Sequence, residues 1–147
     1  MSKIPCIAAL LLSASQAFAL APKDLLGNWA GHHEETVNGR GKTFSVVLKG
    51  SKISDGAIRL VEHAESPGIT ATYLFKKDGK FSCKTVQYGM HVLSSYSGSW
   101  KSSSGNLIIS GSGTDGRLFG AVTETDKGFR FSGNAAKHKI VINARRR

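Results

Sequence analysis

Short runs of alternating apolar residues, separated by glycine-containing turns, constrain the fold of this chain more than any other feature. The turns include Asn38-Gly39, Asp55-Gly56, Asp78-Gly79 and Asp115-Gly116. Asparagine or aspartate followed by glycine supplies the positive φ angles that tight hairpin turns need. Between the turns the apolar residues fall at every second position, which places them on one face of a strand. These sets are Phe44, Val46 and Leu48; Ile69, Ala71, Tyr73 and Phe75; Leu107, Ile109 and Gly111; and Phe129 and Phe131.

Helical periodicity is absent from every window of about a dozen residues. Only Pro22-Lys23-Asp24-Leu25-Leu26 is expected to make one helical turn, because proline is tolerated at a first helical position. The β-branched run Lys139-Ile140-Val141-Ile142-Asn143 is expected to form the last strand and to pair with the first. We therefore predict an all-β fold, a single antiparallel up-and-down β-barrel of about 8–10 short strands, because closure removes exposed strand edges.

Residues 1–19 have the pattern of a secretory signal peptide. Lys3 precedes the apolar run from Ile4 to Leu12, and Ala17-Phe18-Ala19 places small residues where cleavage after Ala19 requires them. The alternative, a membrane anchor, fits less well, because the apolar core is nearer ten residues than the roughly twenty that span a bilayer. We predict that residues 20–147 form a single exported domain, periplasmic or secreted and not membrane-spanning.

Net charge and cysteine content narrow the classes of partner. The chain carries 20 Lys and Arg against 10 Asp and Glu, a net charge of +10. Polyanions outside the cytosol, such as lipopolysaccharide, acidic exopolysaccharide or anionic lipid, are therefore candidate partners. Nucleic acid is a poor one, because the aromatic residues do not alternate with basic ones as a stacking platform requires. Only Cys83 remains after cleavage, so it is either a buried apolar residue or the site of an intermolecular disulfide.

The basic residues are dispersed except at the C-terminus. Arg145, Arg146 and Arg147 form the one basic run, and we predict that they project beyond the last strand as a mobile basic tail. Such a tail is either a solvated chain end or a polyanion-binding site.

The opening of the predicted first strand, Leu25-Leu26-Gly27-Asn28-Trp29, resembles the Gly-x-Trp opening of lipocalin-like barrels of the calycin type. The resemblance implies a barrel with the tryptophan plugging its closed end and a late arginine packed over the ring. Arg117 and Arg130 are both candidates for that arginine. The chain lacks the disulfide and the C-terminal helix that are usual in this family. Nitrobindin-type haem barrels open similarly, but their long second half is not evident here.

The acidic residues argue against an enzyme. Four of the ten lie in turns, where aspartate hydrogen-bonds its own backbone, and the remaining six are dispersed with no motif for a paired acid and base. The turn residues are Asp55, Asp78, Asp115 and Asp126. A Gly-x-Ser-x-Gly nucleophile motif is also absent. We predict no catalytic residues and no cofactor.

The densest polar cluster is His32-His33-Glu34-Glu35. On a strand, His32 and Glu34 point to one face and the other pair points to the opposite face. Two such ligands hold a divalent metal only with a third from a neighbouring strand, for which His63 and His91 are the candidates. An exposed polar strand end explains the cluster better than a metal site does. We predict no metal site, with His32 and Glu34 as the residues to consider if one exists.

Tyr88, Tyr96 and Trp100 are candidates for the mouth of a ligand pocket, because aromatic rings with one polar tip line such pockets. Their alternative is ordinary barrel core. By analogy of fold, the sequence favours an exported, non-enzymatic protein that binds a small apolar or amphipathic ligand. The alternatives are a protein-interaction module, either an inhibitor or an envelope accessory factor, and a polyanion binder that acts through its basic surface.

Overall fold

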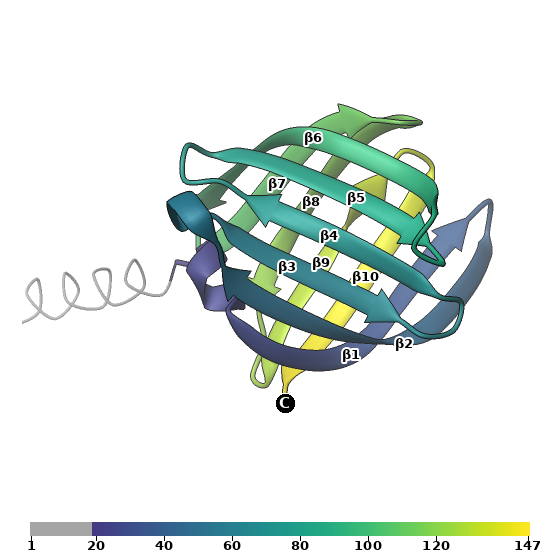
Figure 1. Ribbon diagram of the computed structural model, residues 1–147, viewed down its shortest axis with the longest axis horizontal. Helices are drawn as coiled ribbons and strands as arrows, with labels where there is room; N and C mark the ends of the chain where they lie inside the picture. Colours follow the sequence, from purple (N-terminus) through teal and green to yellow (C-terminus); the bar gives the residue numbers. More distant parts are fainter. Residues whose placement is uncertain (1–18) are drawn as a thin grey trace, which may run out of the picture.

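Ten strands follow one another around the wall of a closed antiparallel barrel (Figure 1). The structure, a computed structural model, describes residues 19–147, so the predicted signal peptide lies outside the described residues except for Ala19. The strands are β1 (Gly27–Val37), β2 (Arg40–Lys52), β3 (Ile58–Ala64), β4 (Ile69–Phe75), β5 (Lys80–Gln87), β6 (His91–Ser103), β7 (Asn106–Gly113), β8 (Gly116–Glu124), β9 (Gly128–Ala135) and β10 (His138–Arg146).

Each strand pairs with its neighbours in sequence, and β1 closes the barrel by pairing with β10. That closing ladder runs from Trp29 opposite Arg146 to Thr36 opposite Lys139. The predicted all-β, up-and-down barrel and the pairing of the last strand with the first are therefore confirmed. Within residues 19–147, no helix is long and apolar enough to cross a membrane.

Most of the predicted glycine turns join consecutive strands. At Asn38-Gly39 both φ angles are positive, 52° and 77°, and at Ser104-Gly105 they are 53° and 82°. Paired positive φ values match the right-handed twist of the two strands that such a turn connects. Asp55-Gly56 also lies between consecutive strands, β2 and β3, but it belongs to a 3₁₀ turn, η2 (Ser54–Gly56), and not to a two-residue hairpin turn.

The alternating apolar sets face the inside of the barrel, as predicted. Most of their members belong to the buried core, and Leu107 is completely buried. Because each strand contributes every second side chain to the interior, the core forms a lining around the barrel axis.

One end of the barrel is closed by the segment that precedes β1. The predicted helical turn is present there as a 3₁₀ helix, η1 (Pro22–Leu25), with Leu25 only 1% exposed. The carbonyl oxygen of Leu25 accepts a hydrogen bond of 3.0 Å from the indole Nε1 of Trp29. Phe129 meets the Trp29 ring edge to face, at 4.8 Å between centroids. We call this the closed end. The opposite end, where the turn between β1 and β2 lies, is the open end.

The arginine that packs over Trp29 is Arg146, and neither Arg117 nor Arg130 takes this place. Its guanidinium carbon lies 4.2 Å from the ring centroid, and its Nη1 donates to the carbonyl oxygen of Leu26 at 3.2 Å. Register explains the difference, because Arg146 is paired with Trp29 across the closing ladder. Arg117 is the second residue of β8, at the open end, and Arg130 is exposed between two inward phenylalanines of β9.

The C-terminal arginines differ in position from the predicted mobile tail. Arg145 and Arg146 lie within β10, where Arg145 is paired with Ala30 and Gly128. The backbone N–H of Arg147 donates to the carbonyl oxygen of Asn28 at 3.0 Å. The chain end is therefore held against β1, and a polyanion-binding role for these arginines stays a prediction.

Candidate ligand-binding cavity

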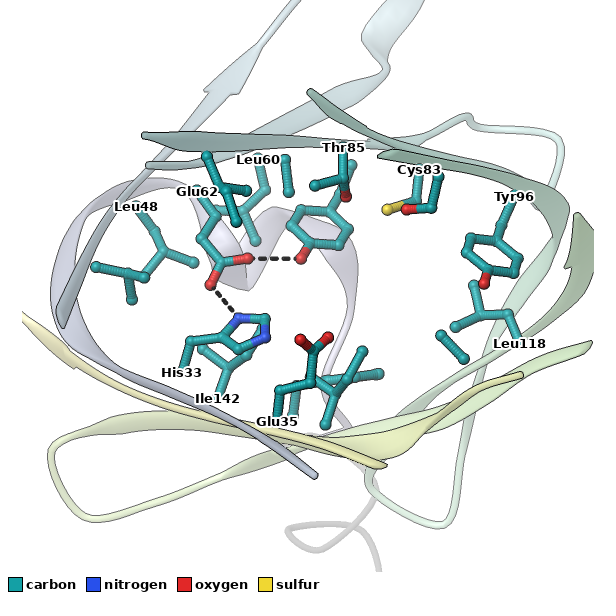
Figure 2. A pocket seen from close by; sticks show the side chains of 18 of the residues that line it. His33, Glu35, Leu48, Leu60, Glu62, Cys83, Thr85, Tyr96, Leu118 and Ile142 are labelled. Carbon is teal, nitrogen blue, oxygen red and sulfur yellow. Dashed lines mark hydrogen bonds and ion pairs between the residues drawn. The ribbon is translucent and has the colours of Figure 1, made fainter. Parts of the chain in front are cut away.

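The barrel encloses a cavity of about 330 Å³, at the small end of the range typical of ligand pockets. It extends from Leu25 at the closed end to Lys42, Leu93 and Asp115 at the open end. Most of the wall is apolar, with side chains that include Leu48, Leu60, Phe75, Phe81, Ile109, Val122 and Ile142. Figure 2 shows the hollow, with His33, Glu35, Glu62 and Tyr96 pointing into it.

Three polar side chains from three different strands meet on one wall of the cavity. They are His33 on β1, Glu62 on β3 and Tyr73 on β4. The Tyr73 hydroxyl donates to Oε1 of Glu62 at 2.6 Å, and Nδ1 of His33 lies 2.7 Å from Oε2. With the proton assigned to Nδ1, His33 is the second donor, so each carboxylate oxygen accepts one hydrogen bond. The His33 ring also stacks on Phe44, at 4.7 Å between centroids.

Glu62 is the one charged side chain that is buried among the described residues, at 4% exposure. Removing a carboxylate from water is costly unless hydrogen bonds replace the lost hydration. The two donors supply that replacement, and removing either would leave a buried acceptor unpaired. The His33–Glu62–Tyr73 network is therefore a fixed polar point in an otherwise apolar wall.

Burial and the charge of Glu62 keep two other cavity groups protonated. Burial, and then the nearby Glu62, raises the pKa of Tyr73 well above its usual value. The same two causes, again with burial first, raise the pKa of the Cys83 thiol to about 12. At neutral pH the cavity therefore presents a neutral phenol and a neutral thiol, neither of which is an activated nucleophile.

A second polar group lies nearer the open end, around Glu35 on β1. Its Oε2 is 3.4 Å from Nζ of Lys42, and its Oε1 is 3.3 Å from Nδ1 of His138. The latter separation is within ion-pair distance but lacks hydrogen-bond geometry. Nδ1 of His138 is consequently the one buried side-chain polar atom without a hydrogen-bond partner in residues 19–147.

The predicted aromatic mouth is divided between different places. Only Tyr96 lines the cavity. Tyr88 is 70% exposed in the β5–β6 turn. Trp100 packs against the core towards the closed end, and its Nε1 donates to the carbonyl oxygen of Lys76 at 2.7 Å. A ligand-binding role for these three residues stays a prediction.

The histidine and glutamate cluster points in two directions, as strand geometry requires. His32 and Glu34 are exposed on the outer face, whereas His33 and Glu35 line the cavity. His63, one of the two suggested third ligands, instead forms a 2.9 Å hydrogen bond with Thr70. In the part of the chain that the structure describes, no group of three or more His, Cys, Asp or Glu side chains is arranged to hold a metal ion.

The sequence pattern did not identify Glu62 as a site residue, and it placed Tyr73 in an inward apolar set without indicating its hydrogen bond to Glu62. A signal for Glu62 was present, because it occupies the inward position between Leu60 and Ala64 on β3. A lone carboxylate in an apolar alternation must find buried partners, but the alternation does not say which.

No protein-family model matches this chain, and no curated protein matches it. The functional inference therefore rests on the cavity and its side chains.

Cys83 offers a check on the cavity wall. The thiolate is the reactive form of cysteine. In the folded protein the rate of alkylation by iodoacetamide should therefore keep rising with pH until the pH approaches the Cys83 pKa of about 12. In the urea-unfolded chain it should level off above the ordinary pKa of about 8.5. At pH 8 we expect labelling of the folded protein to be at least about a hundredfold slower, judged by mass spectrometry. Equal rates in the two states would place Cys83 on the surface.

Proposed function

We propose that this protein is an exported, non-enzymatic binding protein that holds a small apolar or amphipathic ligand inside a lipocalin-like barrel. The single observation that carries the proposal is the apolar cavity of about 330 Å³ with one fixed polar network in its wall. Burying the apolar part of a ligand contributes about 25 cal/mol of favourable free energy for each Å² of apolar surface removed from water. The network gives the polar part of a ligand a defined place.

Three further observations support parts of the proposal. Trp29 at the closed end, with Arg146 over its ring, reproduces the arrangement that the lipocalin-like resemblance implies. Export is supported by the sequence pattern of residues 1–19. A binding role is favoured over catalysis because the Tyr73 and Cys83 side chains in the cavity remain protonated at neutral pH.

Filling the cavity tests the proposal. N-phenyl-1-naphthylamine is a neutral probe whose fluorescence rises in apolar surroundings, and we expect it to bind the mature protein saturably. Ala71 is buried and lines the cavity, so Ala71→Phe should fill the space and weaken probe binding by more than about tenfold, equivalent to about 1.4 kcal/mol.

The matched control is Ala121→Phe, which adds the same ring to a strand position outside the cavity lining. It should leave probe affinity unchanged, and circular dichroism should show that both variants keep the fold. Absence of saturable binding, or equal loss in both variants, would contradict the proposal. We would then favour the alternative function, a protein-interaction module.

A further inference from the structure

We propose that the cavity selects amphiphiles that carry a positively charged amine, and that Glu35 accepts the ammonium group. The inference rests on the proposed function, because it specifies the chemistry of the ligand that the same cavity would hold. It is carried by the charges that line the cavity and by the incomplete contacts of the Glu35 carboxylate.

The charge of the cavity wall is opposite in sign to that of the whole chain. Among the residues that the structure describes, three carboxylates line the cavity, against a single ammonium group, that of Lys42, and no arginine. The chain as a whole carries a net charge of +10. The imidazoles of His33 and His138 add positive charge only when protonated. The three carboxylates belong to Glu35, Glu62 and Asp115.

Of the three carboxylates, Glu35 is the one placed to bind a ligand. Both oxygens of Glu62 already accept hydrogen bonds within the network, and Asp115 is exposed in the β7–β8 turn. Glu35 lines the cavity and its side chain is 19% exposed. Its partners are held loosely, because the Lys42 side chain is 62% exposed and the Nδ1 of His138 forms no hydrogen bond.

A ligand ammonium group can therefore take the place of the Lys42 ammonium beside Glu35 while Lys42 turns into solvent. Charge-assisted hydrogen bonds of this kind are among the stronger ones in proteins. From that position an apolar tail would extend towards the closed end, among Leu48, Ile109 and Phe81.

An anionic head group would be repelled by the carboxylates of the cavity wall. Next to Glu35 it would lie close to a like charge, and deeper in the cavity it would approach the buried carboxylate of Glu62. Like charges repel strongly where little water screens them. The negative charge of Glu62 already acts on other groups in the cavity wall, since it helps to raise the pKa values of Tyr73 and Cys83.

The test uses three probes of equal chain length that differ only in head group: decylamine, decanol and decanoate. Each is titrated at pH 8.0 and low salt against the complex with N-phenyl-1-naphthylamine. Histidine is ordinarily neutral at this pH. We expect decylamine to displace the naphthylamine probe at a concentration at least about tenfold lower than decanoate does, with decanol between them.

Two glutamine variants locate the effect. Glu35→Gln should weaken the binding of decylamine about tenfold and change the binding of decanol by less than about twofold, because only the charged head group loses its partner. Glu34→Gln removes the same charge from the adjacent, outward position of β1 and should change neither. Circular dichroism checks that both variants are folded.

The outcomes separate the two proposals. If decanol displaces the probe but decylamine shows no advantage over decanoate, the amine inference is overturned and the proposed function stands. Equal effects of Glu34→Gln and Glu35→Gln would also overturn the inference, because the preference would then come from the overall charge. If the naphthylamine probe itself does not bind, the proposed function fails, and the amine inference fails with it.

Discussion

Replacing Trp29 by alanine is expected to lower the free energy of unfolding by about 3–5 kcal/mol, the usual cost of removing a large aromatic side chain from a core. Trp29 is only 3% exposed, and it links three parts of the closed end. Its indole N–H holds η1 through the carbonyl of Leu25, its ring meets Phe129, and its face carries the guanidinium of Arg146. The substitution therefore removes packing and leaves the closing contacts of η1 and β10 without a common partner.

Equilibrium urea unfolding followed by far-ultraviolet circular dichroism measures this loss. The control is Phe119→Ala, which truncates another aromatic residue but one that is 59% exposed on β8. We expect that control to change stability by less than about 0.5 kcal/mol. A loss below about 1 kcal/mol for Trp29→Ala would mean that the tryptophan does not organise the closed end.

Replacing Gly31 by alanine is expected to destabilise the barrel by about 3 kcal/mol or more, because its backbone lies against the neighbouring strand. A Cβ atom at this position would collide with the backbone carbonyl oxygen of Asn143, and it would lie 3.0 Å from the Cα of Ala144. Both neighbours are backbone groups of β10, so no side-chain rotation relieves the overlap. The ladder between β1 and β10, which closes the barrel, would have to shift.

Gly41→Ala is the matched control for Gly31→Ala. At Gly41 the nearest atom to a new Cβ is the Thr36 hydroxyl oxygen at 3.6 Å, an ordinary contact. We expect a change within about 0.5 kcal/mol in the same urea experiment. Equal losses for the two variants would show that close approach of β1 and β10 at Gly31 is not what makes that glycine necessary.

The strands and their closure could be predicted from the sequence because both depend on local patterns. Alternation placed Phe44, Val46 and Leu48 on the inner face, and Asn38-Gly39 marked a turn whose φ angles are positive as expected. Closure followed from the number of strands and from the need to remove free edges, which the pairing of β1 with β10 confirms.

Contacts between side chains on different strands could not be predicted from the sequence, because they depend on the register with which the strands pair. His33 and Glu62 are 29 residues apart in sequence and lie on strands that are not adjacent in the sheet order. Alternation separated the pair His33 and Glu35 from the pair His32 and Glu34 but did not say which pair faces inward. The choice of Arg146 over Arg117 and Arg130 likewise required the pairing of Trp29 with β10.

Methyl-group NMR during titration with N-phenyl-1-naphthylamine tests most directly whether a ligand binds inside the barrel. Ile109 and Ile108 are neighbours on β7, but only Ile109 lines the cavity. We expect a saturable, one-to-one change in the δ1 methyl resonance of Ile109, with that of Ile108 nearly unmoved. Changes at Ile108 alone, or changes confined to the exposed Met90 of the β5–β6 turn, would contradict it.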